Sequence, residues 1–139
     1  MGPMKTLISF AALLSLVASA SAATAPVAHP LEGRWTNPKK SVVLHMAPCG
    51  PAYCGKVAWA SEKARTDASN GGTPNLIGTE LISDFVPDGR GGWKGRIFLP
   101  KQNIRAGGTI RLVGRDTLMV KGCALAGLIC KEQSWQRID

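Results

Sequence analysis

Between residues 33 and 138, the chain is divided into eight short segments in which apolar and polar side chains alternate. Clusters of glycine, proline and aspartate, such as Pro87-Asp88-Gly89, separate these segments, and no long helical pattern interrupts them. Alternation of period two predicts β-strands with one buried face, and regular turn signals predict antiparallel neighbours. We therefore expect strands at residues 33–36, 41–47, 54–60, 79–86, 93–99, 108–113, 117–123 and 131–138.

A sheet with one apolar face has to bury that face. Closing eight strands into a barrel buries it and removes the exposed edges. The first predicted strand carries Trp35 and the last carries Trp135. A tryptophan in both the first and the last strand indicates a sheet that closes by pairing these two strands. The sequence therefore predicts an all-β fold, an eight-stranded antiparallel up-and-down barrel. Such a barrel is either filled by side chains or holds one small ligand.

The first 22 residues have the features of a signal peptide. Lys5 supplies a positive charge, residues 7–17 are apolar, and Ala20-Ser21-Ala22 is a small-residue cleavage site. A membrane anchor is the less favoured alternative, because the apolar run of about 11 residues falls short of the ~20 that span a bilayer. We expect residues 23–32 to be a flexible lead-in, residues 33–139 to form a single barrel domain, and the protein to be periplasmic or secreted.

Four cysteines occur as two local pairs, Cys49 with Cys54 and Cys123 with Cys130. An even count in an exported chain predicts disulfides, and three pairings are possible. We favour the local pairing, because each pair brackets a turn-forming segment and a hairpin can bring its two cysteines within bonding distance. A zinc site is disfavoured, since the spacings differ from CxxC pairs and an oxidising compartment disfavours free thiols. We expect no metal.

Basic residues outnumber acidic ones by 17 to 9, which gives a formal net charge of +8. This excess favours an anionic partner, such as an anionic component of the cell envelope, but scattered basic residues also fit a surface that is merely solvated. A nucleic-acid partner is disfavoured, because an exported protein rarely meets one. The basic residues expected on the outer face of the barrel are Lys56, Lys94, Arg96, Arg111 and Lys121.

No residue pattern indicates catalysis. Neither His29 nor His45 has the serine and acidic partners that a nucleophilic triad requires. Asp67 and Asp84 are the only plausible carboxylate pair for glycoside chemistry, and the Gly-Gly pairs precede strands rather than helices. We therefore expect no enzymatic activity and no cofactor.

Residues 61–78 form a long, polar connection that contains Asp67 and Asn70. Ordered connections above ~12–15 residues are uncommon and are often functional. Three interpretations stay open for this segment: a lid over one end of the barrel, an ordinary loop, or a segment with one helical turn.

Several motifs resemble known families. The Gly-x-Trp motif of Gly33-Arg34-Trp35 is similar to the lipocalin signature, and lipocalin-like barrels often place an arginine of the last strand over that tryptophan. The resemblance implies that Gly33, Trp35 and Arg137 close one end, where a guanidinium on the tryptophan face contributes ~0.5–2 kcal/mol.

The chain also resembles the bacterial domain-of-unknown-function family 2147, small exported proteins with a lipocalin-like barrel. That resemblance rests on Gly33-Arg34-Trp35, Tyr53-Cys54-Gly55-Lys56-Val57, Asp67 with Asn70, Gly92-Trp93-Lys94-Gly95-Arg96-Ile97 and Trp135-Gln136-Arg137.

The favoured function is binding of a small apolar or amphipathic molecule in the barrel interior. The candidate lining residues are Leu44, Val57, Trp59, Leu81, Phe85, Ile97, Ile110, Leu112, Leu118 and Val120. A filled core is an equal alternative, and the protein would then be a structural or interaction protein of the envelope that acts through its basic outer face. We expect no stable membrane insertion.

Overall fold

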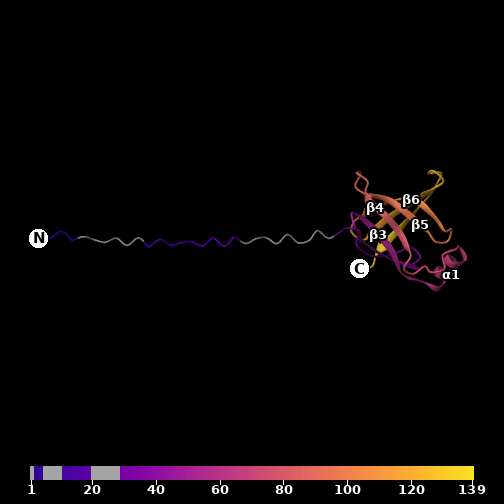
Figure 1. The fold of residues 1–139 in the computed structure, drawn as a ribbon, viewed down its shortest axis with the longest axis horizontal. Coiled ribbons are helices and arrows are strands. Elements are labelled where there is room, and N and C mark those ends of the chain that lie inside the picture. The colour runs from indigo at the N-terminus through magenta and orange to yellow at the C-terminus, as the bar shows by residue number, and fades with distance from the viewer. Residues whose placement is uncertain (1, 5–10, 20–28) are drawn as a thin grey trace.

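The computed structural model describes residues 2–4, 11–19 and 29–139. Residues 33–137 form a closed barrel of eight antiparallel strands in sequence order, which confirms the predicted fold (Figure 1). The predicted signal peptide falls partly outside the described residues, as do Lys5 and the cleavage site, and it stays a prediction. In the described part of the chain, no helix is long and apolar enough to cross a membrane.

The barrel contains eight strands and one helix. Their bounds are β1 (Gly33–Thr36), β2 (Val42–Cys49), β3 (Ala52–Ala60), α1 (Glu62–Asn70), β4 (Glu80–Pro87), β5 (Trp93–Leu99), β6 (Ile104–Val113), β7 (Thr117–Ala124) and β8 (Ile129–Arg137). The last strand meets the first through the pairs Trp35 with Arg137 and Thr36 with Gln136. The largest departure from the predicted bounds is β6, which begins four residues early because residues 104–107 pair with β5.

Because the strands alternate in direction, their turns gather at two ends of the barrel. The segment 29–32, the C-terminus and the turns at 50–51, 88–92 and 114–116 lie at one end, which we call the closed end. Helix α1 and the turns at 37–41, 100–103 and 125–128 lie at the other, the helix end. Figure 1 shows the C-terminus and α1 on opposite sides of the barrel.

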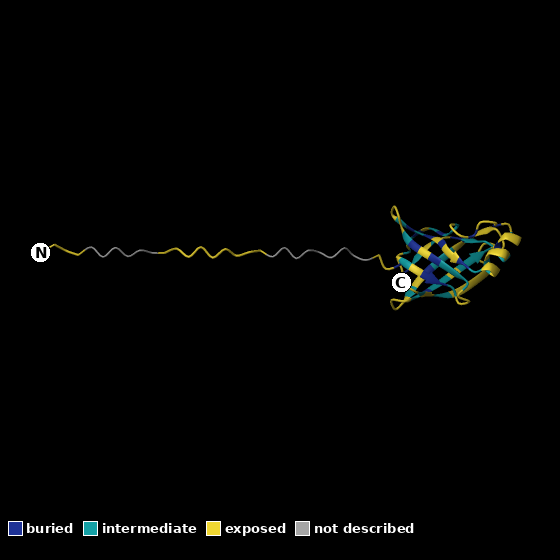
Figure 2. Cartoon of the chain, turned by 90° about the horizontal axis from the view of Figure 1, so that it is seen from below, coloured by how far each residue is buried: buried dark blue, intermediate teal, exposed yellow. Residues whose placement is uncertain are grey.

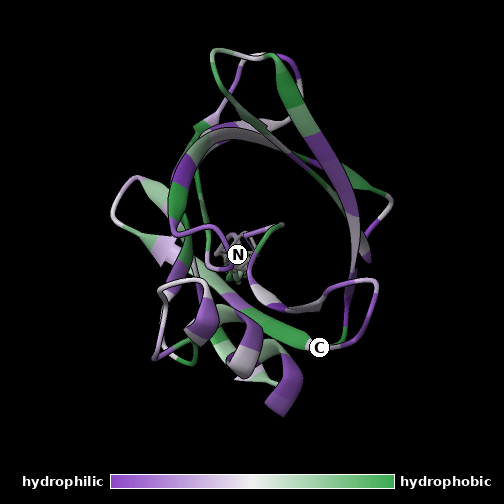
Figure 3. Cartoon of the chain, turned by 90° about the vertical axis from the view of Figure 1, so that its right-hand side faces the viewer, coloured by the Kyte–Doolittle hydropathy of each residue, from purple (hydrophilic) through white to green (hydrophobic). Residues whose placement is uncertain are grey.

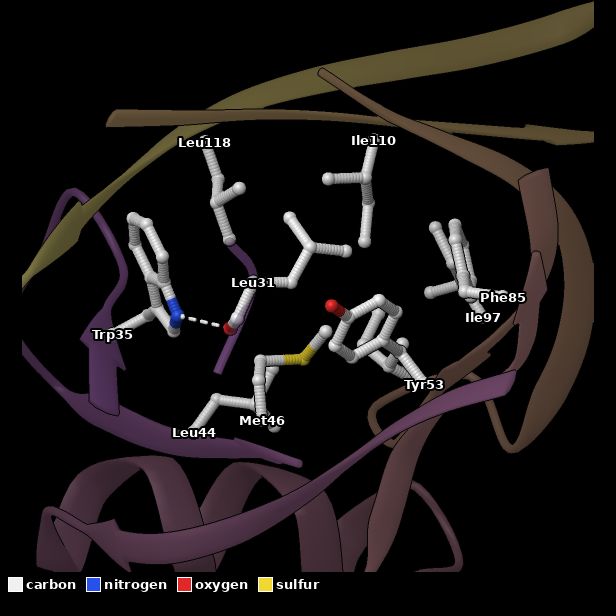
Figure 4. Packing of buried hydrophobic residues seen from close by; sticks show 10 residues of the cluster. Leu31, Trp35, Leu44, Met46, Tyr53, Phe85, Ile97, Ile110 and Leu118 are labelled. Atoms are coloured by element: carbon white, nitrogen blue, oxygen red, sulfur yellow. Dashed lines mark hydrogen bonds between the residues drawn. The ribbon is translucent and has the colours of Figure 1, made fainter. Parts of the chain in front are cut away.

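Apolar side chains from most strands meet inside the barrel. The buried cluster consists of Leu31, Trp35, Leu44, Met46, Tyr53, Ile82, Phe85, Ile97, Ile110 and Leu118 (Figure 4). Figure 2 shows buried stretches interspersed with less buried ones along the strands of the barrel, while most of α1 and the turns are exposed. Interior glycines make room for the large side chains: a Cβ at Gly108 would overlap the Cδ1 of Ile97, and a Cβ at Gly95 would lie 2.5 Å from the Cδ2 of Phe85.

The segment 61–78 contains a nine-residue helix, longer than the single turn considered from the sequence. The Ser61 hydroxyl caps its start by accepting a hydrogen bond from the backbone N–H of Ala64 at 3.1 Å. Ala68 and Leu76 pack on Val57 and Ala60 in a second, smaller buried cluster. Viewed along the barrel axis, α1 lies against one side of the ring of strands rather than across it (Figure 3).

The two disulfides follow the predicted local pairing. Cys49 and Cys54 join β2 to β3 with their Cα atoms 5.8 Å apart, and Cys123 and Cys130 join β7 to β8 with their Cα atoms 4.1 Å apart. No cysteine is free in the part of the chain that the structure describes. Disulfides persist outside the reducing cytoplasm, so the pairing fits a protein of an oxidising compartment.

Candidate functional site

Arg137 closes one end of the barrel together with Trp35. Its guanidinium carbon lies 4.2 Å from the centroid of the Trp35 ring. The same guanidinium donates hydrogen bonds to the carbonyl oxygens of Glu32 (2.6 Å), Pro30 (2.8 Å) and Arg115 (3.0 Å). The guanidinium is therefore engaged with three carbonyls and the Trp35 ring of the same chain, as expected for a group that closes this end of the barrel.

The segment 29–32 fills the closed end from inside. Leu31 is fully buried in the core, and its carbonyl accepts a hydrogen bond from Trp35 Nε1 at 3.0 Å. Figure 4 shows Leu31 in the middle of the buried side chains. The sequence places this leucine in a flexible lead-in, but the structure extends the barrel domain to include it. Gly33 permits the approach, since its φ is +131° and a Cβ would lie 2.7 Å from Nη1 of Arg137.

Most of the predicted lining residues do face the interior. Leu44, Phe85, Ile97, Ile110 and Leu118 belong to the main buried cluster, and Leu81, Leu112 and Val120 are partly buried against it. Val57 is buried in the smaller cluster beneath α1. These side chains contact one another, so the middle of the barrel is a packed core.

The prediction for Trp59 is wrong. Its side chain is 49% exposed and points outward. The cause is a β-bulge: Val43 pairs with Trp59 and Leu44 pairs with Val57, so that Ala58 is an extra residue in β3. One extra residue reverses the inward and outward alternation beyond it.

A hollow lies on the outer face of the barrel, over β6, β7 and β8. It has a volume of about 450 Å³ and is lined by Gly107, Gly108, Thr109, Arg111, Met119, Lys121, Cys123 and Glu132. A second hollow of about 300 Å³, lined by Asp88, Arg90, Lys94 and Thr109, lies beside it and shares Thr109. Neither hollow reaches the core, because most of their side chains alternate with the buried residues of the same strands, such as Ile110 and Leu118.

Strand register assembles the polar residues of these hollows into a row. Lys94 pairs with Thr109, Thr109 with Lys121, and Lys121 with Glu132, across β5, β6, β7 and β8. Adjacent strands lie about 4.8 Å apart, so the backbones of Lys94 and Lys121 flank Thr109 at roughly 10 Å from each other. Two cations are therefore placed on either side of a hydroxyl group.

The charged residues around this row differ in whether they already form an ion pair within the protein. Asp88 accepts hydrogen bonds from the backbone N–H groups of Arg90 (2.7 Å) and Gly92 (3.1 Å), and its carboxylate lies 3.6 Å from Arg111. The bond from Arg90 is the largest cause that lowers the pKa of Asp88 below its ordinary value. Asp88 is thus ionised at neutral pH and engaged with Arg111. Among residues 29–139, no salt bridge involves Lys94 or Lys121.

The sequence placed Lys94, Arg111 and Lys121 on the outer face, and the structure brings these three residues together at the hollows. Arg96 lies in the next row, opposite Gly107, whereas Lys56 lies on β3 and pairs with His45. Sequence reasoning missed Thr109 and Met119, because only the pairing of β6 with β7 shows that they share this surface.

The two loop residues singled out from the sequence lie on α1. Asp67 accepts a hydrogen bond from Lys63 at 2.8 Å and lies 3.6 Å from Lys101 in the turn between β5 and β6. The hydrogen bond from Lys63 is the main cause that lowers the pKa of Asp67. Asn70 is exposed at the end of the helix. Asp67 therefore links α1 to the turn between β5 and β6, and the described residues contain no cluster of metal ligands around it.

Comparison with known proteins places the chain in a family. A bacterial family described as "Uncharacterized protein conserved in bacteria (DUF2147)" matches residues 33–137. No curated protein matches the chain. Protein HP1028 from Helicobacter pylori, described as belonging to the lipocalin family, has a similar structure with a TM-score of 0.61 and 13% sequence identity. The match covers 78% of this chain and 83% of that chain, and it supports the fold alone. The chain belongs to the DUF2147 family and adopts a lipocalin-like barrel.

Proposed function

We propose that this protein is a periplasmic interaction protein that binds anionic groups of the cell envelope, phosphates or carboxylates, on the outer face of β5 to β8. The observation that carries the proposal is the position of the larger hollow. It lies on the basic outer surface, while the interior expected to hold a ligand is occupied by packed side chains. The two disulfides support the compartment.

The row of residues across the hollows suits an anion. Lys94 and Lys121 supply two cations, and the Thr109 hydroxyl between them is a hydrogen-bond donor. Met119 adds an apolar wall, and the open shape leaves the lysines hydrated until a partner arrives. Contacts between exposed charges are individually weak, so we expect binding that depends on several contacts and on salt concentration.

We expect Lys94→Gln combined with Lys121→Gln to weaken binding of inorganic polyphosphate, a soluble polyanion, by about 5–30-fold at low salt. The estimate assigns ~0.5–1 kcal/mol to each exposed charge contact. Isothermal titration calorimetry at two salt concentrations measures the effect. The matched control is Lys39→Gln with Lys40→Gln, which removes the same charge from the turn between β1 and β2. Equal weakening by both double variants would mean that only net charge matters and would contradict the proposal.

A small apolar ligand in the interior is the second candidate, and one feature favours it. Gln133 pairs with Val120, which faces the interior, so the register directs Gln133 inward, yet Gln133 is exposed. Strand β1 pairs with β8 only at Gln136 and Arg137, so among residues 29–139 the part of β8 near the helix end has no paired strand on this side. A ligand would have to enter there and displace packed side chains, whereas the outer hollows need no rearrangement.

A further inference from the structure

We propose that the tip of the β7–β8 hairpin, residues 124–129, inserts into the headgroup region of an anionic lipid bilayer. The tip itself contains none of the residues that line the polyanion-binding hollow, and Lys121 is the residue of the hollow that also belongs to the basic surround of the tip. It concerns contact with one face of a bilayer, not a segment that spans it.

The hairpin tip is apolar and exposed. The sequence Ala124-Leu125-Ala126-Gly127-Leu128-Ile129 contains no polar or charged side chain. Leu125 is 67% exposed, Leu128 is 85% exposed and Ile129 is 52% exposed. Single exposed leucines are ordinary, but three large apolar side chains within five residues form a patch of the kind that marks an interaction site.

The tip is also held in a defined shape. The Cys123–Cys130 disulfide joins the two strands directly below it, and the backbone N–H of Leu128 donates to the carbonyl oxygen of Leu125 at 3.1 Å. Gly127 adopts a φ of +86° that completes the turn. A segment ordered before binding loses less conformational entropy when it binds, so a rigid apolar tip binds better than a flexible one of the same composition.

The position of the tip allows it to reach a flat surface. In Figure 1 the loop between β7 and β8, coloured near yellow, projects from the barrel on the side away from the C-terminus. Ile104, also exposed, begins β6 at the same end, next to β7. The apolar patch is therefore convex. A convex patch does not form a groove for a peptide, but it can enter a fluid interface.

The charges around the tip identify the kind of surface. Lys121 and Lys131 are exposed on β7 and β8, which lead to the tip, and Arg105 is exposed at the start of the neighbouring strand β6. Arg96 lies opposite Gly107, which pairs with Cys123. The nearest acidic group on the hairpin is Glu132, opposite Lys121. An apolar tip within a basic surround matches a membrane with anionic headgroups. The same like charges disfavour a second copy of the chain as the occupant.

Vesicle sedimentation tests the proposal with the whole mature chain. We expect the wild type to bind vesicles of phosphatidylglycerol and phosphatidylcholine in a 3:7 ratio, and to bind pure phosphatidylcholine at least ~10-fold more weakly. Leu125→Ser with Leu128→Ser should weaken binding to the anionic vesicles by at least ~10-fold. The control is Val113→Ser, since Val113 is 57% exposed at the closed end; this variant should change binding by less than ~2-fold.

A second readout locates the contact. Leu128→Trp should become quenched by brominated phosphatidylglycerol more than the wild type, whereas Val113→Trp should not. Unchanged vesicle binding by the Leu125→Ser, Leu128→Ser variant would overturn the proposal. The proposal would also be overturned if the wild type self-associated in the absence of vesicles and the Leu125→Ser, Leu128→Ser variant did not. The two proposals can be tested separately. The Leu125→Ser, Leu128→Ser variant should retain polyphosphate binding, so either binding activity can be lost while the other is still measured.

Discussion

Replacing Arg137 by lysine should lower the free energy of unfolding by about 2–3 kcal/mol. The guanidinium donates to three carbonyl oxygens and lies over the Trp35 ring. A lysine keeps the charge, but its compact ammonium cannot reproduce the planar fork, and hydrogen bonds from charged groups contribute ~1.5–3 kcal/mol each. Thermal unfolding followed by circular dichroism should show a midpoint lower by on the order of 10 °C for a domain of this size.

The matched control for this prediction is Arg115→Lys. Arg115 is exposed, and it contributes its carbonyl oxygen rather than its side chain to the closed end. Its replacement should change stability by less than about 0.5 kcal/mol. If Arg137→Lys is equally mild, the closed end does not depend on the guanidinium, and Leu31 and Trp35 must hold it by packing alone.

Replacing Gly95 by alanine should lower the free energy of unfolding by about 2–4 kcal/mol. The new Cβ would lie 2.5 Å from Cδ2 of Phe85, 2.7 Å from the carbonyl oxygen of Ser83 and 2.8 Å from that of Asp84. Phe85 is fully buried and two of the three contacts are backbone, so the clash cannot be relieved by one rotamer change. Urea unfolding of the variant and the wild type, analysed with the same slope of unfolding free energy against urea concentration, measures the loss of stability.

Gly107→Ala is the control, since a Cβ at Gly107 meets no atom within 4 Å. It should be neutral or slightly stabilising, because alanine reduces the entropy of the unfolded chain. Equal loss at both positions would indicate a general cost of removing glycine from the sheet. It would contradict the claim that the interior at Phe85 is filled.

The sequence was informative wherever local pattern determines structure. Alternation fixed all eight strands, because burying one face of a sheet requires period two. The local cysteine pairs were predictable because each encloses a turn, and short hairpins bring such residues together. The meeting of Trp35 with Arg137 was suggested by a family resemblance and not by spacing, since 102 positions in the numbering separate the two residues.

The errors arose where the structure depends on contacts between strands. At Trp59 a bulge reverses the alternation, and in β4 the irregular pairing around Asp84, whose φ is +58°, leaves Ile82 and Phe85 both buried. No local signal marks either position. For residues 61–78 the sequence supports no more than one helical turn as one of three interpretations, because the segment is polar and only Ala68 of α1 is buried.

The choice between a filled core and a ligand pocket also depended on contacts distant in sequence. Barrel size alone allows either a filled interior or one small ligand. Inward-facing Gly95 and Gly108 leave space beside their strands. In the barrel that space is taken by Phe85 and Ile97, and Leu31 enters from the N-terminal segment. The outer hollow was equally hidden, since Thr109 and Met119 join the lysines only through the register of three strands.

Methyl-group NMR tests most directly whether the partner binds outside the barrel. Met119 faces the outer hollow, while Ile110, Leu118 and Val120 face the core from the same two strands. Titration with inorganic polyphosphate should shift the Met119 methyl signal to saturation and leave the other three unchanged. Dodecanoate, an apolar probe, should shift none of them at micromolar concentration. Shifts of Leu118 and Val120 with dodecanoate, with Met119 unmoved by polyphosphate, would contradict the account and assign binding to the interior.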